Sequence, residues 1–392
     1  MRCHHIAVCG FIPPDILDHI ARNGDQKQQD RARHALEASA EMRGERRALG
    51  AIPGLLAVAP GGKRRTVYDA KKTRDLPGTV VRGEGNPASK DPAVNEAYEG
   101  SGKTYDFYKA VYGRNSIDDH GLRLDSSVHF GVAFSNALWN GKQMVYGDGD
   151  DKLFNRFTRS LDVIGHELTH GVTQYSAALP YHDEPGALNE SFSDVFGILM
   201  KQWTLKQTAA KSDWLVGEGI FTKQVHGVAI RSFKAPGTAY DDKVLGKDPQ
   251  PAHMKDYKHI QTDAGGVHTN SGIPNHAFYL LATMLGGKAW EVAGKIWYVT
   301  LTQKLHGETS FQQCADATYK TAAELFGAGA APQQAVLQAW KGVGIDISAA
   351  LVAAGPKLTV KKPEVVAFEP PGAAAEVPNL DVTAPRRRLS VK

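Results

Sequence analysis

Two histidines and two glutamates have the spacing of a hydrolytic zinc site. His166 and His170 stand four positions apart in the run HELTH, Glu167 lies between them, and Glu190 follows later in the chain. Side chains four positions apart on a helix point the same way, about 6 Å apart along its axis, so both imidazoles can bind one ion. With Glu190 as the third ligand, a fourth position stays open for water, as in catalytic zinc sites. Glu167 would lie beside the metal, where it can act as a base.

The segments around these residues have the apolar spacing of helices. Residues 160–175 and 187–203 each repeat apolar side chains at helical intervals, and Ser160 is a candidate N-cap for the first segment. The second segment puts Glu190 and Asp194 on one face, so Asp194 can accept the outer N–H of a ligand histidine and fix its tautomer. The alternative is a buried helix with two hydrogen-bonded histidines. The helical context and the two added carboxylates disfavour it.

The composition is that of a soluble globular protein with room for two lobes. The chain has 392 residues, of which 42% are hydrophobic and 22% charged, and a net charge of +4. The hydrophobic content excludes a disordered or fibrous chain, and the small charge indicates no nucleic-acid partner. Three cysteines, Cys3, Cys9 and Cys314, do not form a disulfide framework. Cys3 could offer a thiolate to the zinc, although an uninvolved thiol is the simpler interpretation.

The N-terminal residues do not have the pattern of a conventional secretory signal. A short apolar run, IAVCGFI, is followed directly by IPPD without a small-residue cleavage site. No apolar stretch reaches the ~18 residues that a membrane helix needs. We therefore expect no membrane partner. We also expect the protein to be a monomer. We expect secretion by a non-classical route, with the cytoplasm as the alternative location.

The pattern changes along the chain in four regions. Residues 1–50 look detachable, with a Pro-initiated helix in IPPDILDHIARNG that stops at Gly24. Residues 51–160 are β-rich, 161–350 are mainly helical, and 351–392 form a flexible Pro/Ala-rich tail. This order of strands and then helices predicts an α+β fold. The strand-like runs are 64–70, 78–85, 126–134 and 141–150; a helical stretch is 92–113, and an irregular stretch is 206–272.

Four longer blocks resemble the thermolysin-like metalloproteases. They are SNALWNGKQMVYGDGD, VIGHELTHGVTQYSAALPY, GALNESFSDVFG and GGVHTNSGIPNHAFYLL, and the similarity runs from about Tyr68 to Asp346. The runs IPPDIL and QQDRAR resemble the short propeptide of the protealysin-like branch. The resemblance implies a β-rich N-terminal lobe and an α-helical C-terminal lobe that flank a cleft, with the zinc helix at its floor. It also implies that residues 1–50 are a propeptide that covers the cleft until it is cut near residue 50.

The resemblance adds residues on the other side of the metal. It implies the same zinc ligands and the same base as the spacing does. It adds His268 and Tyr181 as two donors to the oxyanion that develops on the substrate carbonyl. Asp263 would hold and charge the His268 ring. A loop histidine and a surface tyrosine are the alternatives for these two residues, and the matched blocks disfavour them.

The resemblance also implies how a peptide binds. Asn136 and Ala137 would bind the substrate backbone as an added strand, and Arg231 would contact a substrate carbonyl. The residues that would line the primed-side pocket are all apolar, which predicts cleavage on the amino side of Leu, Ile, Val or Phe. They are Phe154, Phe157, Val163, Val216, Ile220 and Ile230.

The chain departs from the larger relatives at their double calcium site. Asp162, Asp213 and Glu218 match carboxylates of that site, but Lys201 and Leu215 stand where two acids would be. The Lys201 ammonium could replace an ion by pairing with the remaining carboxylates. We therefore expect at most one calcium ion here and a weak dependence on calcium.

These observations together predict a zinc-dependent endopeptidase that acts on proteins and peptides and is made as a precursor. Zinc would acidify a water molecule, and Glu167 would take its proton as hydroxide attacks a carbonyl polarised by zinc, Tyr181 and His268. The alternative is a catalytically inactive zinc-binding interaction scaffold, which the joint presence of these residues with Asp263 disfavours. An exopeptidase would need an anchor for a free amine, and no acidic motif of that kind stands next to HELTH.

Overall fold

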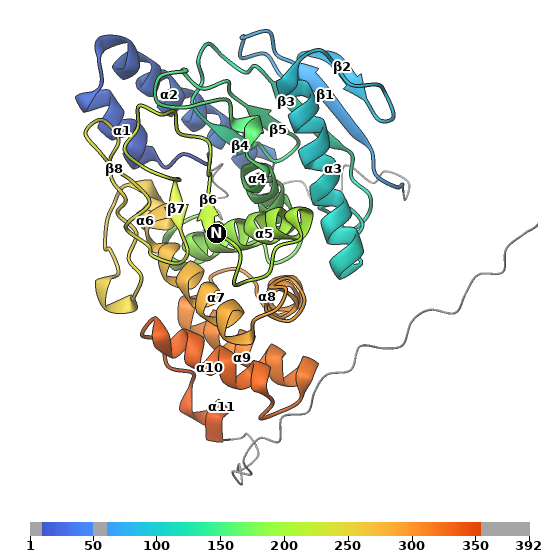
Figure 1. Ribbon diagram of the computed structural model, residues 1–392, viewed down its shortest axis with the longest axis vertical. Coiled ribbons are helices and arrows are strands. Elements are labelled where there is room, and N and C mark those ends of the chain that lie inside the picture. The colour runs from blue at the N-terminus through green and yellow to red at the C-terminus, as the bar shows by residue number, and fades with distance from the viewer. Residues whose placement is uncertain (1–9, 50–60, 354–392) are drawn as a thin grey trace, which may run out of the picture. The chain divides into compact units, whose positions relative to one another are not determined.

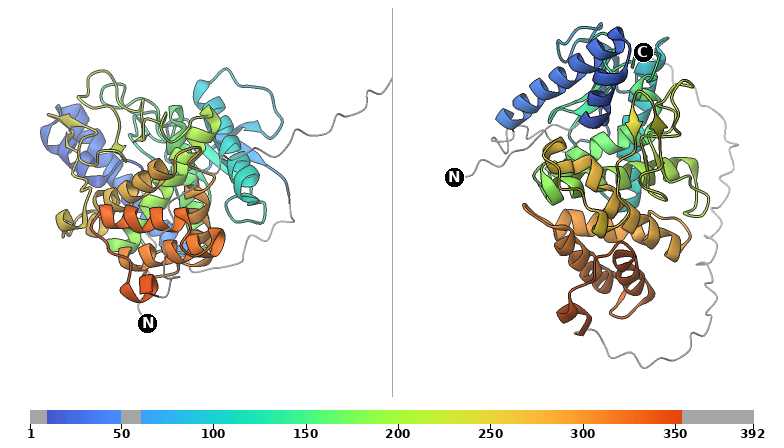
Figure 2. Two further views of the ribbon diagram at one scale, coloured as in Figure 1. Left: turned by 60° about the horizontal axis from the view of Figure 1, so that its bottom comes forward. Right: turned by 90° about the vertical axis from the view of Figure 1, so that its left-hand side faces the viewer.

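The computed structural model describes residues 10–49 and 61–353 (Figure 1). Cys3, the expected cut near residue 50 and the predicted tail after Ala353 lie outside these residues. The described part has two N-terminal helices, a five-stranded sheet and a helical C-terminal half, seen from two further sides in Figure 2. None of its helices combines the length and the apolar content that crossing a membrane requires.

Two helices make up the described part of the predicted N-terminal unit. Helix α1 spans Pro14–Asn23 and α2 spans Gln26–Leu49. As predicted, α1 has proline in its first turn and ends before Gly24. Packing stabilises α1, because one side of it is buried. The buried residues are Ile16, Leu17 and Ile20.

The five strands are short and form one mixed sheet. The order across the sheet is β2-β1-β3-β5-β4. β1 pairs with β3 and β3 with β5 in parallel, whereas β2 and β4 are antiparallel to their neighbours. The outer edge of β4 is therefore open to a further strand. The bounds are β1 Arg65–Asp69, β2 Thr79–Gly83, β3 Leu124–Val128, β4 Ala137–Trp139 and β5 Met144–Tyr146.

The strands differ from the sequence pattern at two places. The run 126–134 is predicted to be strand throughout, but β3 ends at Val128. His129, Gly131 and Ala133 have positive φ angles of 54°, 64° and 52°, so the chain turns away and cannot extend the pairing. The sequence does not predict β4, because its three residues are all buried and too few to show an alternating pattern.

The HELTH motif lies on one of three long helices that pack together. They are α3 (Pro92–Tyr112), α4 (Leu161–Gln174) and α5 (Asp183–Leu205). HELTH lies on α4, as predicted. α4 and α5 cross at Gly165 and Gly197, where a Cβ on Gly197 would lie 2.5 Å from a backbone oxygen of α4. This approach, which only glycine permits, brings the ligand-bearing faces of the two helices together.

The remainder of the C-terminal half is helical after an irregular stretch, as predicted. The stretch 206–272 contains two short hairpins and the distorted helix α6. The hairpin strands are β6 (Leu215–Val216), β7 (Arg231–Ser232), β8 (Asp241–Asp242) and β9 (Gly246–Lys247). The helices are α6 (Asp263–Asn270), α7 (Gly272–Leu285), α8 (Ala293–Gln303), α9 (Phe311–Phe326), α10 (Ala331–Gly342) and α11 (Ala349–Ala353), with 3-10 turns η1 (Phe157–Arg159) and η2 (Met254–Asp256).

An ion cluster joins the start of α4 to α5 and to the loops before and after β6. Lys201 Nζ lies 3.0 Å from Asp213 Oδ2, 3.1 Å from Glu218 Oε2 and 3.9 Å from Asp162 Oδ2. Ser160, predicted as the N-cap of α4, turns its hydroxyl to Glu218 O and Asp162 and makes no cap hydrogen bond. Burial opposes the Lys201 charge, but Asp162 and then Asp213 outweigh it and raise the pKa of the ammonium. We propose that this ammonium takes the place of an ion at the calcium-type cluster.

Lys201→Met should destabilise the protein, because it keeps the length of the side chain but leaves the buried Asp162 carboxylate without its cation. We expect the free energy of unfolding in urea to fall by about 2–4 kcal/mol. A calcium-selective chelator should lower the melting temperature of the unaltered protein by less than about 2 °C. The Lys201 ammonium already pairs with the carboxylates, so removing calcium should cost little stability. The matched control is Lys288→Met, whose pair with Glu291 is more than half exposed. It should cost less than about 0.5 kcal/mol. Equal losses in both variants, or a large effect of the chelator, would contradict the proposal.

Candidate active site

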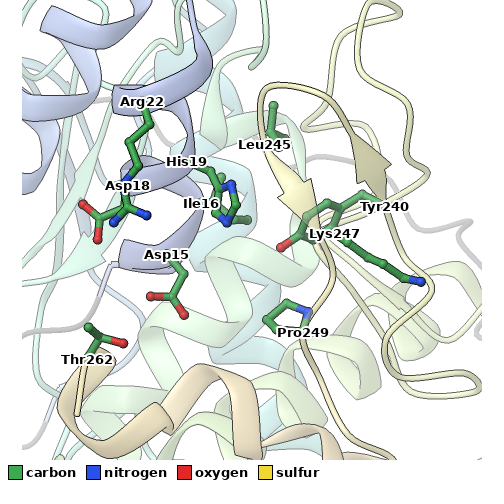
Figure 3. Close-up of a pocket in the computed structure, with 10 residues that line it drawn as sticks. All are labelled: Asp15, Ile16, Asp18, His19, Arg22, Tyr240, Leu245, Lys247, Pro249 and Thr262. Carbon is green, nitrogen blue, oxygen red and sulfur yellow. The ribbon is translucent and has the colours of Figure 1, made fainter. Parts of the chain in front are cut away.

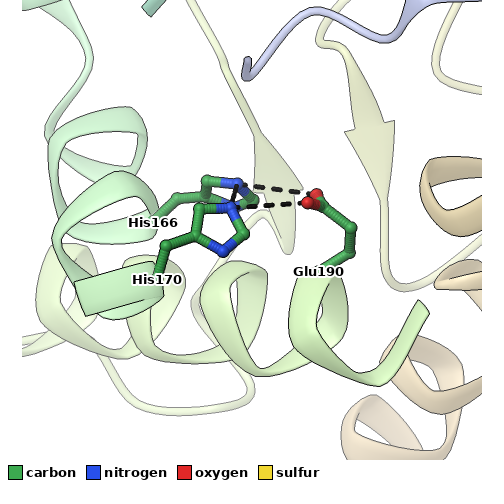
Figure 4. A group of neighbouring side chains, drawn as sticks. All are labelled: His166, His170 and Glu190. Carbon is green, nitrogen blue, oxygen red and sulfur yellow. Dashed lines mark hydrogen bonds and ion pairs between the residues drawn. The ribbon is translucent and has the colours of Figure 1, made fainter. Parts of the chain in front are cut away.

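The three predicted zinc ligands meet between α4 and α5 (Figure 4). His166 and His170 come from α4 and Glu190 from α5, and their ligand atoms all lie within 4.8 Å of one another. The two Nε2 atoms are 3.1 Å apart, and Glu190 oxygens lie 3.6 Å from His166 Nε2 and 3.4 Å from His170 Nε2. Two ligands of one tetrahedral zinc are about 3.3 Å apart, because each lies about 2 Å from the ion. The spacing therefore fits a single zinc ion.

Hydrogen bonds on the far side of each ring direct both Nε2 atoms toward Glu190. His166 Nδ1 donates to Asp194 Oδ1 at 2.8 Å, the partner that the sequence predicts. His170 Nδ1 lies 2.9 Å from Asn189 Oδ1, a partner that the sequence does not predict. When Nδ1 carries the proton, Nε2 keeps its lone pair for a metal. Both rings are thus set in the tautomer that zinc requires.

The Glu190 carboxylate is buried and ionised, as expected for a side chain that binds a cation. The three ligand side chains are at most 2% exposed. Among the described residues, Glu190 Oε2 is buried and accepts no hydrogen bond. Burial opposes its ionisation, but the positive charge nearby, that of His268 first, outweighs burial and holds the pKa of this carboxyl far below its usual range. An ionised buried oxygen beside two imidazole lone pairs fits a bound zinc ion.

Glu167 lies next to the ligands on α4 and is fully buried. Its Oε2 accepts a hydrogen bond from Trp139 N at 2.9 Å. Trp139 is the last residue of β4, so the strand at the open edge of the sheet also positions this carboxylate. The arrangement holds the Glu167 carboxylate next to the three ligand side chains, where the sequence predicts a base.

Tyr181 meets His268 and Asp263 beside the ligands, although it lies 87 residues before His268 in the sequence. Tyr181 OH donates to Glu190 Oε1 at 2.6 Å and lies 3.4 Å from His268 Nε2. His268 Nδ1 donates to Asp263 Oδ1 at 2.6 Å, and its backbone N donates to Asp263 Oδ2. The matched block indicates His268, but no spacing in the sequence predicts that it reaches Glu190.

The backbone and the charges around His268 prepare it as a donor. Ala264, Gly265 and Gly266 all have left-handed φ angles, which turn α6 back so that His268 faces the ligands. Burial would lower the pKa of His268, but the charge of Asp263, and then that of Glu190, outweighs burial and raises the pKa to about 9. An imidazolium at neutral pH donates from both nitrogens.

The N-terminal segment of the chain itself lies along the edge predicted to bind substrate. Phe11 N donates to Ala137 O at 2.9 Å, and Ile12 N donates to the Asn136 side chain at 2.8 Å. Gly10 pairs with β4 as an antiparallel bridge. The sequence predicts that residues 1–50 cover the cleft, but it does not identify these three residues. The signal that was available is the apolar run just before the two prolines.

Arg231 connects this segment to the ligand support. Its Nη1 donates to Phe11 O at 3.3 Å, and its Nε and Nη2 donate to Asp194 at 2.8 and 2.7 Å. The guanidinium lies 4.7 Å from the centre of the Phe11 ring, which meets the His166 ring edge-on at 5.4 Å. The predicted contact with a carbonyl is therefore made here to the chain's own backbone.

The six predicted pocket residues are all buried, with at most 1% of their surface exposed. Ile230 lies next to Phe11, since a Cβ on Gly217 would be 2.9 Å from both side chains. The pocket-lining role of the six stays a prediction. They are Phe154, Phe157, Val163, Val216, Ile220 and Ile230.

The chain is similar to known metallopeptidases over most of its length. The sequence matches the thermolysin metallopeptidase catalytic domain over residues 59–174, the thermolysin metallopeptidase alpha-helical domain over 177–345 and the protealysin propeptide over 9–44. It is 47% identical over 342 residues to an "Extracellular metalloprotease" of Pectobacterium carotovorum subsp. carotovorum, covering 87% of this chain and 97% of that protein. It is 48% identical over 344 residues to "Protease PrtS" of Photorhabdus sp. (strain Az29), covering 86% and 92%.

A solved structure gives the same result for the fold. The precursor of protealysin, a metalloproteinase from Serratia proteamaculans, superposes with a TM-score of 0.79 at 50% identity, covering 86% of this chain and 99% of that one. The fold is therefore thermolysin-like, as predicted, with a small mixed sheet before a helical C-terminal domain. An inactive scaffold receives no support. The chain belongs to the thermolysin family of zinc-dependent metalloendopeptidases and carries a protealysin-type propeptide.

Proposed function

We propose that this chain cuts internal peptide bonds with His166, His170 and Glu190 as its zinc ligands and Glu167 as its acid–base residue. One observation carries the proposal. The backbone carbonyl oxygen of Gly10 lies 3.2 Å from His268 Nε2. The same nitrogen lies 3.7 Å from Glu190 Oε2, so the carbonyl is next to the ligand cluster. A peptide that adds to the edge of β4 would have a carbonyl at the same point.

The roles of the residues follow from their positions. His166, His170 and Glu190 would hold a zinc ion, which would supply a Lewis acid for the water and the scissile carbonyl. Glu167 takes the proton of the attacking water and delivers it to the leaving amine. His268, charged by Asp263, and Tyr181 donate to the carbonyl oxygen as negative charge develops there.

The backbone of the substrate needs its own contacts, because the reacting carbonyl must be held in register with these groups. Asn136, Ala137 and Arg231 supply them along the edge of β4. Their contacts with residues 11 and 12 support this assignment.

Glu167→Gln should abolish turnover while zinc stays bound, because an amide cannot take the proton of the water. We expect kcat on an internally quenched peptide to fall by about 10³-fold or more, with one zinc per chain by atomic absorption. His166→Ala should lose both zinc and activity. The exposed Glu291→Gln serves as the control. Near-normal turnover by Glu167→Gln would refute the role.

The specificity follows from what the cleft already accommodates. Phe11 is fully buried and lies between Arg231 and the Gly217 backbone, with its amide on the edge of β4. A large apolar side chain just after the scissile bond would take this place. We therefore assign cleavage to the amino side of Leu, Ile, Val or Phe.

Peptides with Phe or Leu after the scissile bond should be cut at least about 10-fold faster than the same peptides with Asp, because a buried carboxylate would lose its hydration. A peptide library digested by the activated enzyme and read by mass spectrometry measures this preference. A library cut mainly before charged residues would contradict the assignment.

The N-terminal unit is proposed to be an inhibitory propeptide, because its segment occupies the edge where substrate would bind. A cavity of about 250 Å³ lies between α1 and the loop around β8 and β9 (Figure 3). Asp15 faces this cavity, and burial, followed by the charge of Asp263, raises the pKa of its carboxyl. The two acids repel each other across the interface.

Asp15→Asn should hold the unit more tightly at neutral pH. The docked state raises the pKa of Asp15 above its ordinary 3.8, so protonation favours docking and the docked state weakens as pH rises through the raised value. Removing the charge should slow amide hydrogen exchange of α1 about 3–10-fold at pH 7. The opening of α1, measured by this exchange, should then increase less as the pH rises above 4. Glu167→Gln is the background, which prevents processing, and Asp30→Asn on the exposed side of α2 is the control. Faster exchange in Asp15→Asn would contradict the proposal that the Asp15 charge weakens docking.

We also propose that the protein acts outside the cell and that it is a monomer. The name of the Pectobacterium relative supports an extracellular location. Immunoblotting of culture medium and light scattering of the purified chain test the two points.

A further inference from the structure

We propose that the Gly10–Phe11 peptide bond is itself a substrate of this site and that the chain cuts it in cis, before it is processed near residue 50. This inference rests on the proposed function. It concerns one bond of the inhibitory segment, and it follows from how both sides of that bond are held.

The nitrogen side of the bond is fixed by the sheet. Phe11 N donates to Ala137 O at 2.9 Å, and Ile12 N donates to Asn136 Oδ1 at 2.8 Å. Arg231 Nη1 donates to Phe11 O at 3.3 Å. Three successive backbone groups are thus bound by the residues assigned to hold a substrate backbone, and the segment runs antiparallel to β4.

The carbonyl side of the bond lies at the reacting groups. Gly10 O accepts from His268 Nε2 at 3.2 Å, and this nitrogen is 3.4 Å from Tyr181 OH and 3.7 Å from Glu190 Oε2. The next carbonyl, Phe11 O, is held by Arg231 instead. The Gly10 carbonyl is therefore the one held by His268, whose ring also lies next to Tyr181 OH and to the ligand Glu190.

The side chains of the two residues also suit a bond that is cut between Gly10 and Phe11. Phe11, on the amine side, is fully buried and meets the His166 ring. Gly10, on the carbonyl side, has no side chain. A Cβ there would lie 2.3 Å from Asn136 Nδ2, so glycine allows the backbone to approach this closely. The segment thus has a large apolar residue where the proposed specificity requires one.

The reaction is an ordinary hydrolysis that uses one water molecule. A bond forms between the water oxygen and the Gly10 carbonyl carbon, and the bond from that carbon to Phe11 N breaks. Gly10 ends as a carboxylate, and Phe11 N takes both protons of the water and becomes the new N-terminal ammonium. No oxidant, reductant or further reactant takes part.

The cut would not by itself empty the cleft. The new amine can still donate to Ala137 O, and Arg231 still holds Phe11 O. α1 remains packed through Ile16, Leu17 and Ile20. The product is a shortened propeptide that begins at Phe11 and still covers the site.

Intact-mass measurement of the full chain tests the proposal. The chain is purified in chelator, zinc is added, and samples are taken over a hundredfold range of protein concentration. We expect a species without residues 1–10 to form with a first-order rate that is independent of concentration, and to precede any product that starts near residue 50. Glu167→Gln should not form it. Phe11→Asp should form it at least about 10-fold more slowly, and the matched Phe11→Leu should stay within about threefold.

The position of the segment has its own readout. In full-length Glu167→Gln, hydrogen exchange should show the Phe11 and Ile12 amides protected, and Asn136→Ala should remove the protection of Ile12. Exchange of both amides at the rate of an unstructured chain would overturn the pose. Exchange across α1 shows whether Phe11→Asp leaves the helix docked, so that a slow cut is not mistaken for loss of the whole unit.

The remaining outcomes separate this inference from the proposed function. After trypsin removes the N-terminal unit, the enzyme is assayed on an internally quenched peptide. Suppose that the trypsin-treated enzyme cuts the peptide. If the untreated chain then keeps residues 1–10, or loses them at a rate proportional to protein concentration, the cis cut is wrong and the proposed function stands. If the trypsin-treated enzyme binds zinc and cuts no peptide, both fail.

Discussion

The carboxylate of Asp194 is buried, and it joins four elements of the fold. It accepts hydrogen bonds from His166 on α4, from Arg231 on β7 and from Asn275 on α7, while it is itself on α5. Burial opposes its charge, but Arg231 and then His166 outweigh burial and lower its pKa. Because an unpaired charge in the interior costs several kcal/mol, each of these partners is held in one orientation. A metal ligand and a backbone-binding arginine are thereby positioned by the same acid.

This shared support connects the metal chemistry to the open edge of the sheet. Arg231 uses two nitrogens on Asp194 and leaves Nη1 to hold the backbone carbonyl of Phe11. Trp139 at the end of β4 binds Glu167, and the same strand offers Ala137 O to an added strand. An open sheet edge pairs readily with any extended chain, and in this precursor the N-terminal segment covers it. Under the proposed function, a peptide that pairs with this edge would have its carbonyl placed at the site by the same contacts.

Much of the zinc site follows from local geometry. The spacing of His166, Glu167 and His170 on a helix decides that two rings face one ion and that the acid lies beside it. The apolar periodicity of the next helix predicts that Glu190 and Asp194 share a face. How near the two helices lie is decided by Gly165 and Gly197, and their role is visible only once the helices are seen to cross there. Strand ends were predicted less well, because the positive φ angles at residues 129–133 depend on contacts between distant loops.

By itself, the amino-acid sequence determined the helices, the three ligand types and the order of the β-rich and helical regions, because those depend on neighbours along the chain. Family resemblance pointed to Tyr181, His268 and Arg231, but no spacing predicts their positions. The tertiary structure brings His268 to Glu190 across 78 residues of chain through three left-handed residues of α6. It also places Gly10 against His268 across 258 residues. Contacts of this length are made by packing between elements and by backbone turns with little periodic signal, so only the folded chain shows which carbonyl reaches the site.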